Sequence, residues 1–168
     1  YAEWTTKKEL QLKKNGALYM VSPWSLTWDD ENYYLIAYDE NADCIKHYRV
    51  DKMLNLQMTE AEREGKEHFK KLDMAEYAKK SFGMYGGKEE KVKLLVKNEL
   101  AGVIIDRFGK DLMMIPDGEE HFNFTVRVAV SPTFLSWVIG FGLKAKVLYP
   151  QSVADACKAL CLEAMSHY

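Results

Sequence analysis

The sequence predicts an α+β protein in which a small β-barrel is followed by a ferredoxin-like domain of the split βαβ type. The first third of the chain alternates short aromatic and β-branched runs with polar turns, a pattern typical of strands. From about residue 89, strand-like and helix-like segments follow in the order β-α-β-β-α-β, with one more helix at the end. Hydrophobic residues make up 48% of the 168 residues, which is enough to form packed cores.

The first region, residues 1–58, is expected to hold four or five short strands. An early hairpin is expected at Lys13–Gly16, because Asn-Gly favours a tight primed turn. Ser22-Pro23 is expected to end the strand before it. Closure into a barrel follows from the shortness of the strands, since closing removes unpaired edges. The expected strands are residues 18–21, 24–28, 33–38 and 44–50.

The rest of the chain divides into a charged helical linker, residues 59–88, and a second domain, residues 89–168. In the linker, Thr59 is a candidate N-cap. In the second domain, Ser131-Pro132 starts a helix, with serine as the N-cap and proline in the first turn. The remaining expected elements are strands at 91–97, 112–115, 122–130 and 146–149, and helices at 99–108 and 151–168.

Several classes of function are disfavoured by the composition and motifs. The sequence has no phosphate loop with its following lysine, no nucleophile elbow and no paired histidines on a helix, so we do not expect an enzyme. The three cysteines, Cys44, Cys157 and Cys161, are expected to be buried and reduced, with no metal site and no cofactor. The net charge of −2 means that any site for a polyanion must be local.

The chain is also expected to be cytoplasmic. It lacks a leader followed by an apolar core, and it lacks an apolar run of the ~20 residues that a membrane-spanning helix needs. We therefore expect no contact with a membrane. The abrupt start in strand-like sequence, without an initiator methionine, suggests a fragment of a longer protein.

The most informative stretch is residues 46–53, where Lys46, Arg49 and Lys52 accompany His47 on a strand and its exit. Aromatic residues occur throughout the same region, among them Tyr1 and Trp24. Cations interleaved with flat rings suit a nucleotide or a single strand, because cations hold phosphate and rings stack on bases. Two alternatives remain open. The rings can be core and the cations ordinary strand residues, or His47 can work with Asp51 in an unrecognised hydrolase.

The order of these motifs resembles the WYL domain found in bacterial transcriptional regulators. Val21-Ser22-Pro23-Trp24-Ser25-Leu26 precedes Tyr33-Tyr34-Leu35, and His47-Tyr48-Arg49-Val50-Asp51-Lys52-Met53 is similar to the family's downstream signature. Tyr33 replaces the family's tryptophan, and Lys52 replaces its second arginine. The C-terminal extension of many WYL domains is similar to three later segments, Phe134-Leu135-Ser136-Trp137, Gly140-Phe141-Gly142 and Val147-Leu148-Tyr149-Pro150.

The resemblance implies an Sm-like, SH3-type barrel that senses an effector, followed by a ferredoxin-like extension that contributes to a homodimer. The implied effector is a single-stranded nucleic acid or a nucleotide, and the implied output is operator binding by an N-terminal helix-turn-helix that this chain lacks. Arg49, Lys52 and Lys46 fall on basic positions of the family and are candidate phosphate contacts. Trp24 is a candidate stacking platform, and Tyr1 and His47 complete the ligand-binding set. A small metabolite in the same pocket, or a dimerisation scaffold without a ligand, are the alternatives.

Overall fold

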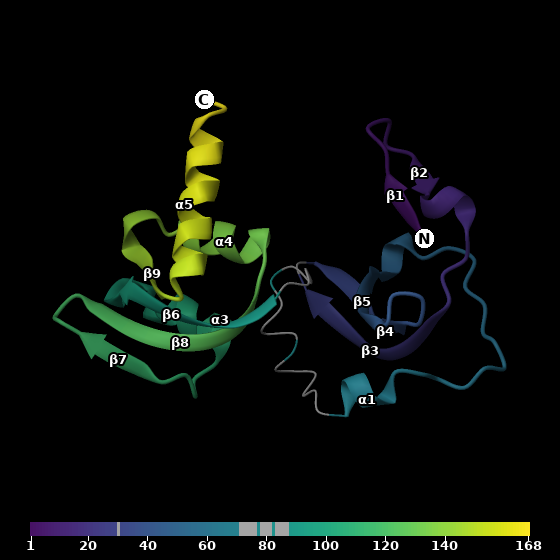
Figure 1. The fold of residues 1–168 in the computed structure, drawn as a ribbon, viewed down its shortest axis with the longest axis horizontal. Helices are drawn as coiled ribbons and strands as arrows, with labels where there is room; N and C mark the ends of the chain where they lie inside the picture. Colours follow the sequence, from purple (N-terminus) through teal and green to yellow (C-terminus); the bar gives the residue numbers. More distant parts are fainter. Residues whose placement is uncertain (30, 71–76, 78–81, 83–87) are drawn as a thin grey trace. The chain divides into compact units, whose positions relative to one another are not determined.

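The computed structural model describes every residue except 30, 71–76, 78–81 and 83–87. The chain divides into two compact units, Tyr1–Ala78 (unit 1) and Lys79–Tyr168 (unit 2). In Figure 1, unit 1 runs from purple to blue-green, and unit 2 from teal to yellow. Each unit is described below by itself.

Unit 1 contains two antiparallel sheets among its described residues. Strand β1 (Ala2–Trp4) pairs with β2 (Leu10–Leu12). The second sheet has the order β3-β4-β5, formed by β3 (Val21–Asp29), β4 (Asn32–Asp39) and β5 (Cys44–Arg49) (Figure 1). The short helical segments are η1 (Lys13–Gly16), η2 (Val50–Lys52) and α1 (Lys66–Phe69). These pairings agree with a β-rich first region, while closure into a barrel stays a prediction.

The course of β3 differs from the sequence-based expectation. Ser22-Pro23 does not end a strand, because β3 runs through it and pairs with β4 from Val21 to Asp29. Proline is tolerated here since β3 lies at the edge of its sheet, where one row of N–H groups has no partner strand. The pairing register shifts between Pro23 and Ser25, and a bulge of this kind re-aims the side chain within it. Trp24 is the residue at that bulge.

The expected hairpin at Lys13–Gly16 is wrong. The turn between β1 and β2 lies at residues 5–9, where the Thr5 N–H donates to the Glu9 carbonyl at 2.8 Å. Residues 13–16 form η1 after β2. Lys14, Asn15 and Gly16 do have positive φ angles of 50°, 53° and 82°. The Asn-Gly pair therefore takes the left-handed conformation that it favours, but at the end of a strand and not between two paired strands.

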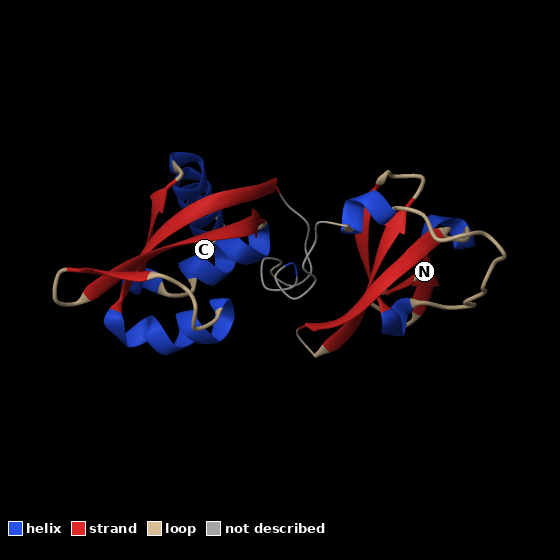
Figure 2. Cartoon of the chain, turned by 90° about the horizontal axis from the view of Figure 1, so that it is seen from below, coloured by secondary structure: helices blue, strands red, loops and turns tan. Residues whose placement is uncertain are grey.

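Unit 2 contains a four-stranded antiparallel sheet with the order β7-β8-β6-β9. The order of its elements along the chain agrees with the β-α-β-β-α-β expectation, and a final helix follows. Figure 2 shows this unit's helices beside its sheet. The elements are β6 (Lys88–Lys97), η3 (Asn98–Leu100), α3 (Ala101–Phe108), β7 (Met114–Asp117), β8 (His121–Val130), α4 (Pro132–Ile139), η4 (Gly142–Lys144), β9 (Ala145–Tyr149) and α5 (Gln151–Met165).

The core of unit 2 lies on one face of its sheet. Alternate residues of β6 and β8 are buried, as expected for strands with one face toward a core. Ile104 of α3, Phe134 of α4 and Val153 of α5 join the same cluster, so all three helices cover that face. Helix α4 begins as predicted: Ser131 precedes it, and the Ser131 Oγ accepts from the Phe134 N–H.

The part of the linker before residue 71 is less helical than the sequence predicts. Residues 53–65 contain no helix, Thr59 caps none, and α1 spans only four residues. The rest of the expected helical stretch, apart from Lys70, Tyr77 and Phe82, lies outside the described residues. Gly65 precedes α1 with a φ of 79°, and a Cβ at Gly65 would lie 2.4 Å from the Tyr38 ring. Only glycine allows the chain to pass this close to the sheet.

The burial expected of the cysteines is wrong for two of the three. Cys44 and Cys161 are exposed, and Cys157 is partly buried. Burial raises the pKa of the Cys157 thiol. None of the three forms a disulfide.

Candidate ligand-binding site

A cavity of about 480 Å³ lies in unit 1, between the β3-β4-β5 sheet and the segment at residues 53–63. This volume is within the range that small-molecule sites occupy. Most of its lining is apolar. The lining residues are Tyr1, Leu18, Tyr19, Met20, Val21, Ser22, Pro23, Leu35, Glu40, Tyr48, Met53, Leu54, Asn55, Leu56, Gln57, Met58, Thr59, Ala61, Glu62 and Arg63.

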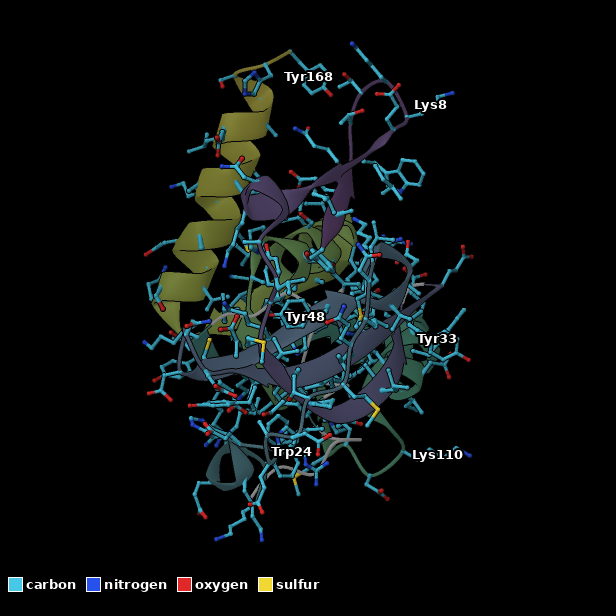
Figure 3. All side chains as sticks on the ribbon, turned by 90° about the vertical axis from the view of Figure 1, so that its right-hand side faces the viewer. Lys8, Trp24, Tyr33, Tyr48, Lys110 and Tyr168 are labelled. Atoms are coloured by element: carbon cyan, nitrogen blue, oxygen red, sulfur yellow. The ribbon has the colours of Figure 1, made fainter. Side chains whose placement is uncertain are left out.

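Strand register determines which face of the sheet forms the wall. Leu35 of β4 lies opposite Tyr48 of β5, so their side chains share a face. Tyr48 is only 7% exposed, whereas Tyr33, farther along the same face, is 58% exposed (Figure 3). Tyr1 and Tyr19 pack on Tyr48 with ring centroids 5.6 and 6.0 Å away, both edge to face. The three tyrosines therefore form one aromatic wall of the cavity.

A buried carboxylate fixes this wall. Asp39 is 3% exposed, and its Oδ2 accepts from the Lys46 Nζ at 2.6 Å and from the Tyr48 hydroxyl at 2.9 Å. Its Oδ1 accepts from the Ala42 N–H at 3.1 Å. The Lys46 ammonium holds the pKa of Asp39 below its usual value, so the carboxylate stays charged. Burial and Asp39 together raise the pKa of Tyr48, which therefore stays a donor.

The opposite wall, residues 53–63, is held to η2 at its start and to β3 at its end. The Met53 N–H donates to the Val50 carbonyl, and the Glu64 N–H donates to the Ser22 Oγ at 2.9 Å. The Arg63 guanidinium donates to the Pro23 carbonyl at 3.3 Å. Between these attachments the segment has no regular structure, and its Leu56 and Met58 side chains are largely exposed. An irregular wall with exposed apolar side chains can adjust to an occupant.

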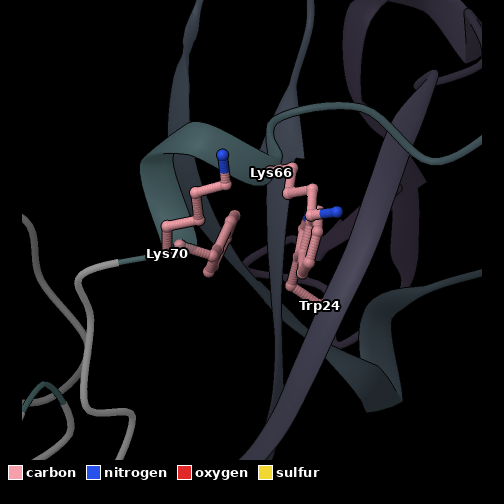
Figure 4. A pocket seen from close by; sticks show the side chains of 4 residues that line it. Trp24, Lys66 and Lys70 are labelled. Carbon is pink, nitrogen blue, oxygen red and sulfur yellow. The ribbon is translucent and has the colours of Figure 1, made fainter.

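A second cavity, of about 260 Å³, is lined by Trp24, Lys66, Phe69 and Lys70 (Figure 4). Trp24 stacks on Phe69 with centroids 4.8 Å apart and an interplanar angle of 15°. The Arg63 guanidinium lies 3.8 Å from the centroid of the same indole. The Trp24 Nε1 donates to the Glu64 carbonyl at 2.7 Å. The indole therefore anchors the chain around Gly65 to the sheet through contacts within unit 1.

The six sequence-predicted site residues do not gather around one cavity. Alternation along β5 puts Lys46 on the face of Tyr48, and His47 and Arg49 on the other face. Tyr1 lines the larger cavity and Trp24 the smaller one, while Lys46, His47, Arg49 and Lys52 line neither.

Three of the four residues that line neither cavity have identified partners in unit 1. Lys46 pairs with Asp39, as described above. Arg49 makes a two-pronged ion pair with Asp51, at 3.0 Å from its Nε and 2.8 Å from its Nη2. The His47 Nε2 lies 3.0 Å from the Tyr77 hydroxyl. The fourth, Lys52, lies in η2 and is partly exposed.

Sequence reasoning missed the irregular wall. Met53, Leu54, Leu56 and Met58 are apolar but follow neither a helical nor a strand period, so their pattern predicts neither a core nor a site. The missing period was the available signal, because an apolar stretch that forms neither a helix face nor a strand face has to cover another part of the protein. Arg63 was missed because it was assigned to the charged linker.

Two other kinds of feature were searched for in the described part of the chain. It contains no group of three or more His, Cys, Asp or Glu side chains arranged to hold a metal ion. No described helix has the length and apolar character needed to cross a membrane.

Comparison with known proteins identifies two family models in the chain. Residues 9–58 match the WYL domain and residues 88–165 match the WCX domain. Among solved structures, the chain is similar to proteasome accessory factor B/C (PafBC) of Arthrobacter aurescens, with 19% identity and a TM-score of 0.40 over 99% of this chain and 24% of that one. The chain thus spans about a quarter of that protein's length. No curated protein matches the chain.

Proposed function

The chain belongs to the WYL-domain family, with a WYL domain followed by a WCX domain, and from this premise we propose that it is the effector-sensing portion of a transcriptional regulator. The observation that carries the proposal is the cavity of about 480 Å³. Much of its lining falls in residues 9–58, the segment that matches the WYL domain. A concave, mainly apolar site with a few polar groups is the usual form of a small-molecule site.

Within this proposal, a compact effector is favoured over a long single-stranded nucleic acid. A polyanion needs several unpaired cations along one groove. Here Lys46 pairs with Asp39, Arg49 pairs with Asp51, and the two cations lie on opposite faces of β5. A nucleic-acid effector would have to displace both carboxylates. The small-metabolite alternative needs no such rearrangement.

The wider architecture is part of the same proposal. We propose that unit 1 is an Sm-like barrel, supported by the bond from the Arg49 N–H to the Tyr1 hydroxyl at 3.0 Å, which ties the N-terminal segment to β5. A ferredoxin-like unit 2 is supported by the strand order β7-β8-β6-β9. The regulator would act as a homodimer through unit 2 and read operator DNA through a helix-turn-helix elsewhere in the full protein. The site would bind a ligand, not catalyse a reaction.

The test is whether the cavity holds a molecule. The chain is purified without denaturation, and native mass spectrometry compares its mass with that of the denatured chain. We expect a bound molecule that Ala61→Trp removes, since Ala61 lines the cavity and a large ring would fill it. The matched control is Ala42→Trp, at an exposed alanine of unit 1 outside the cavity. Equal retention by both variants would overturn the proposal.

A further inference from the structure

Charge is unevenly distributed around the larger cavity. Its charged side chains among the described residues are Glu40, Glu62 and Arg63, so the side-chain charge is negative, with both glutamates exposed. The described residues place neither glutamate in an ion pair. The Arg63 guanidinium already contacts the Trp24 ring and the Pro23 carbonyl. The one cationic side chain among the described lining residues therefore has partners of its own, while the two carboxylates remain to meet an occupant.

The aromatic wall, like the two carboxylates, favours a positively charged ligand. The face of a tyrosine ring carries negative potential and attracts cations, quaternary ammonium groups in particular. One face of the Tyr19 ring already contacts a cation, since the Lys14 Nζ lies 4.6 Å from its centroid, and Tyr48 is only 7% exposed. The partly exposed Tyr1 ring and the remaining surface of Tyr19 are therefore what a ligand can meet. The methionine side chains of the lining, at Met20, Met53 and Met58, are soft and unbranched and can pack around a bulky apolar body.

We propose that the cavity binds a small organic cation with a bulky apolar body, a lipophilic onium ion in chemical terms. The tyrosine wall and Glu40 and Glu62 would meet the positive charge, and residues 53–58 would cover the apolar part. The inference rests on the proposed function, since it names the ligand class of the same sensor. It disfavours a phosphate-bearing ligand, which would place a further anion beside two carboxylates.

The test uses two probes of the same shape and opposite charge. Tetraphenylphosphonium and tetraphenylborate are titrated into the chain in a sodium buffer, with binding followed by calorimetry. We expect the cation to bind at least about fivefold more tightly, because partly solvated carboxylates discriminate charge only modestly. The preference should shrink as salt is raised, since screening weakens interactions between exposed charges. Ala61→Trp should weaken the binding of both probes.

Matched variants identify the source of the preference. Glu40→Gln combined with Glu62→Gln should bring the two affinities together. Glu9→Gln combined with Glu60→Gln makes the same change of charge at exposed glutamates outside the cavity, and should leave the preference intact. Stronger binding of the borate, or a preference that survives loss of Glu40 and Glu62, would overturn the inference.

Failure of the inference and failure of the proposed function look different. If native mass spectrometry finds a bound anion, such as a nucleotide, that Ala61→Trp removes, the sensor proposal stands and the cationic ligand class is wrong. If no molecule co-purifies and Ala61→Trp changes the affinity of neither probe, both proposals are overturned.

Discussion

The two units use their apolar side chains differently. Unit 2 gathers 13 buried hydrophobic residues, from Phe82 to Val153, into one continuous cluster. Among the described residues of unit 1 the buried hydrophobic ones are few, namely Ala2, Ile36, Ala37 and Tyr48, and many other apolar side chains line a cavity or remain exposed. A filled core favours a single rigid structure, whereas an unfilled one leaves space for a ligand. This difference is consistent with the proposal that unit 1 binds a ligand and that unit 2 is the scaffold.

The largest effect is expected from opening a void in unit 2. Phe134 is fully buried and contacts Phe82, so Phe134→Ala should lower the free energy of unfolding by about 3–5 kcal/mol. Denaturant unfolding, followed by far-ultraviolet circular dichroism, measures the loss. Binding at the unit 1 cavity should be unchanged, and a parallel loss of binding would break the division of roles.

The next largest effect is expected at the buried carboxylate of unit 1. Asp39→Asn removes the charge that Lys46 and Tyr48 contact, and should lower the stability of unit 1 by about 2 kcal/mol. The Lys46 side chain is 38% exposed and regains water, which limits the loss. Amide hydrogen exchange across β4 and β5 measures it, and unchanged protection there would contradict the assigned role of Asp39.

The same carboxylate gives unit 1 an acid limit. The pKa of Asp39 lies below its ordinary value of 3.8 in the folded protein, so its contribution to stability is complete above that value. It is lost as pH falls from about 4 through the lower folded pKa. The free energy of unfolding of unit 1 should therefore fall as the pH is lowered through this window. In Asp39→Asn, the slope of this free energy against pH should be shallower.

A smaller effect is expected from the indole that anchors the chain around Gly65. Trp24→Ala removes a stack on Phe69, a cation–π contact with Arg63 and a hydrogen bond, and should cost about 1–2 kcal/mol. Trp28→Ala is the control, because Trp28 is exposed and pairs only edge to face with Tyr33. Limited proteolysis should cut near residues 63–70 faster in Trp24→Ala alone, and equal cutting of both variants would argue against the anchor.

The smallest effect is expected at the signature cations. Arg49→Ala combined with Lys52→Ala should change the stability of unit 1 by less than about 1 kcal/mol, because the ion pair of Arg49 with Asp51 is partly solvated. Affinity for a length series of single-stranded DNA oligomers measures their role in binding. We expect the affinity to depend little on oligomer length. An affinity that rises with oligomer length and falls in the double variant would support a nucleic-acid effector instead.

Much of the fold could be predicted from local signals. Helix α4 follows from Ser131-Pro132, and the strand at residues 33–38 follows from its aromatic and β-branched run, with β4 extending one residue farther at each end. Local signals failed where the pairing of strands determined the structure. Pro23 looked like the end of a strand, but an edge position made it acceptable. Asn15-Gly16 looked like a hairpin, but the paired turn lies at residues 5–9.

The candidate site was harder to predict because it depends on partners distant in the sequence. Lys46 could be identified as a cation, but its neutralisation by Asp39 depends on the register of β4 and β5. Asp51 was visible two residues from Arg49, yet only the side-chain geometry shows the two-pronged pair. The wall at residues 53–63 has no helical or strand period from which it could be predicted. The cavity forms only when that segment lies over the sheet.

If unit 1 senses an effector as proposed, the attachment of Glu64 to Ser22 has a mechanical consequence. The stretch that ends there forms one side of the cavity, and along the polypeptide it is also the route by which the WYL domain leads into the WCX domain. A molecule that pushes this stretch outward must pull on the point where the covalent connection departs. The strain would fall on the contacts that join residues 22–24 to residues 63–64, which are the Glu64–Ser22, Arg63–Pro23 and Trp24–Glu64 hydrogen bonds.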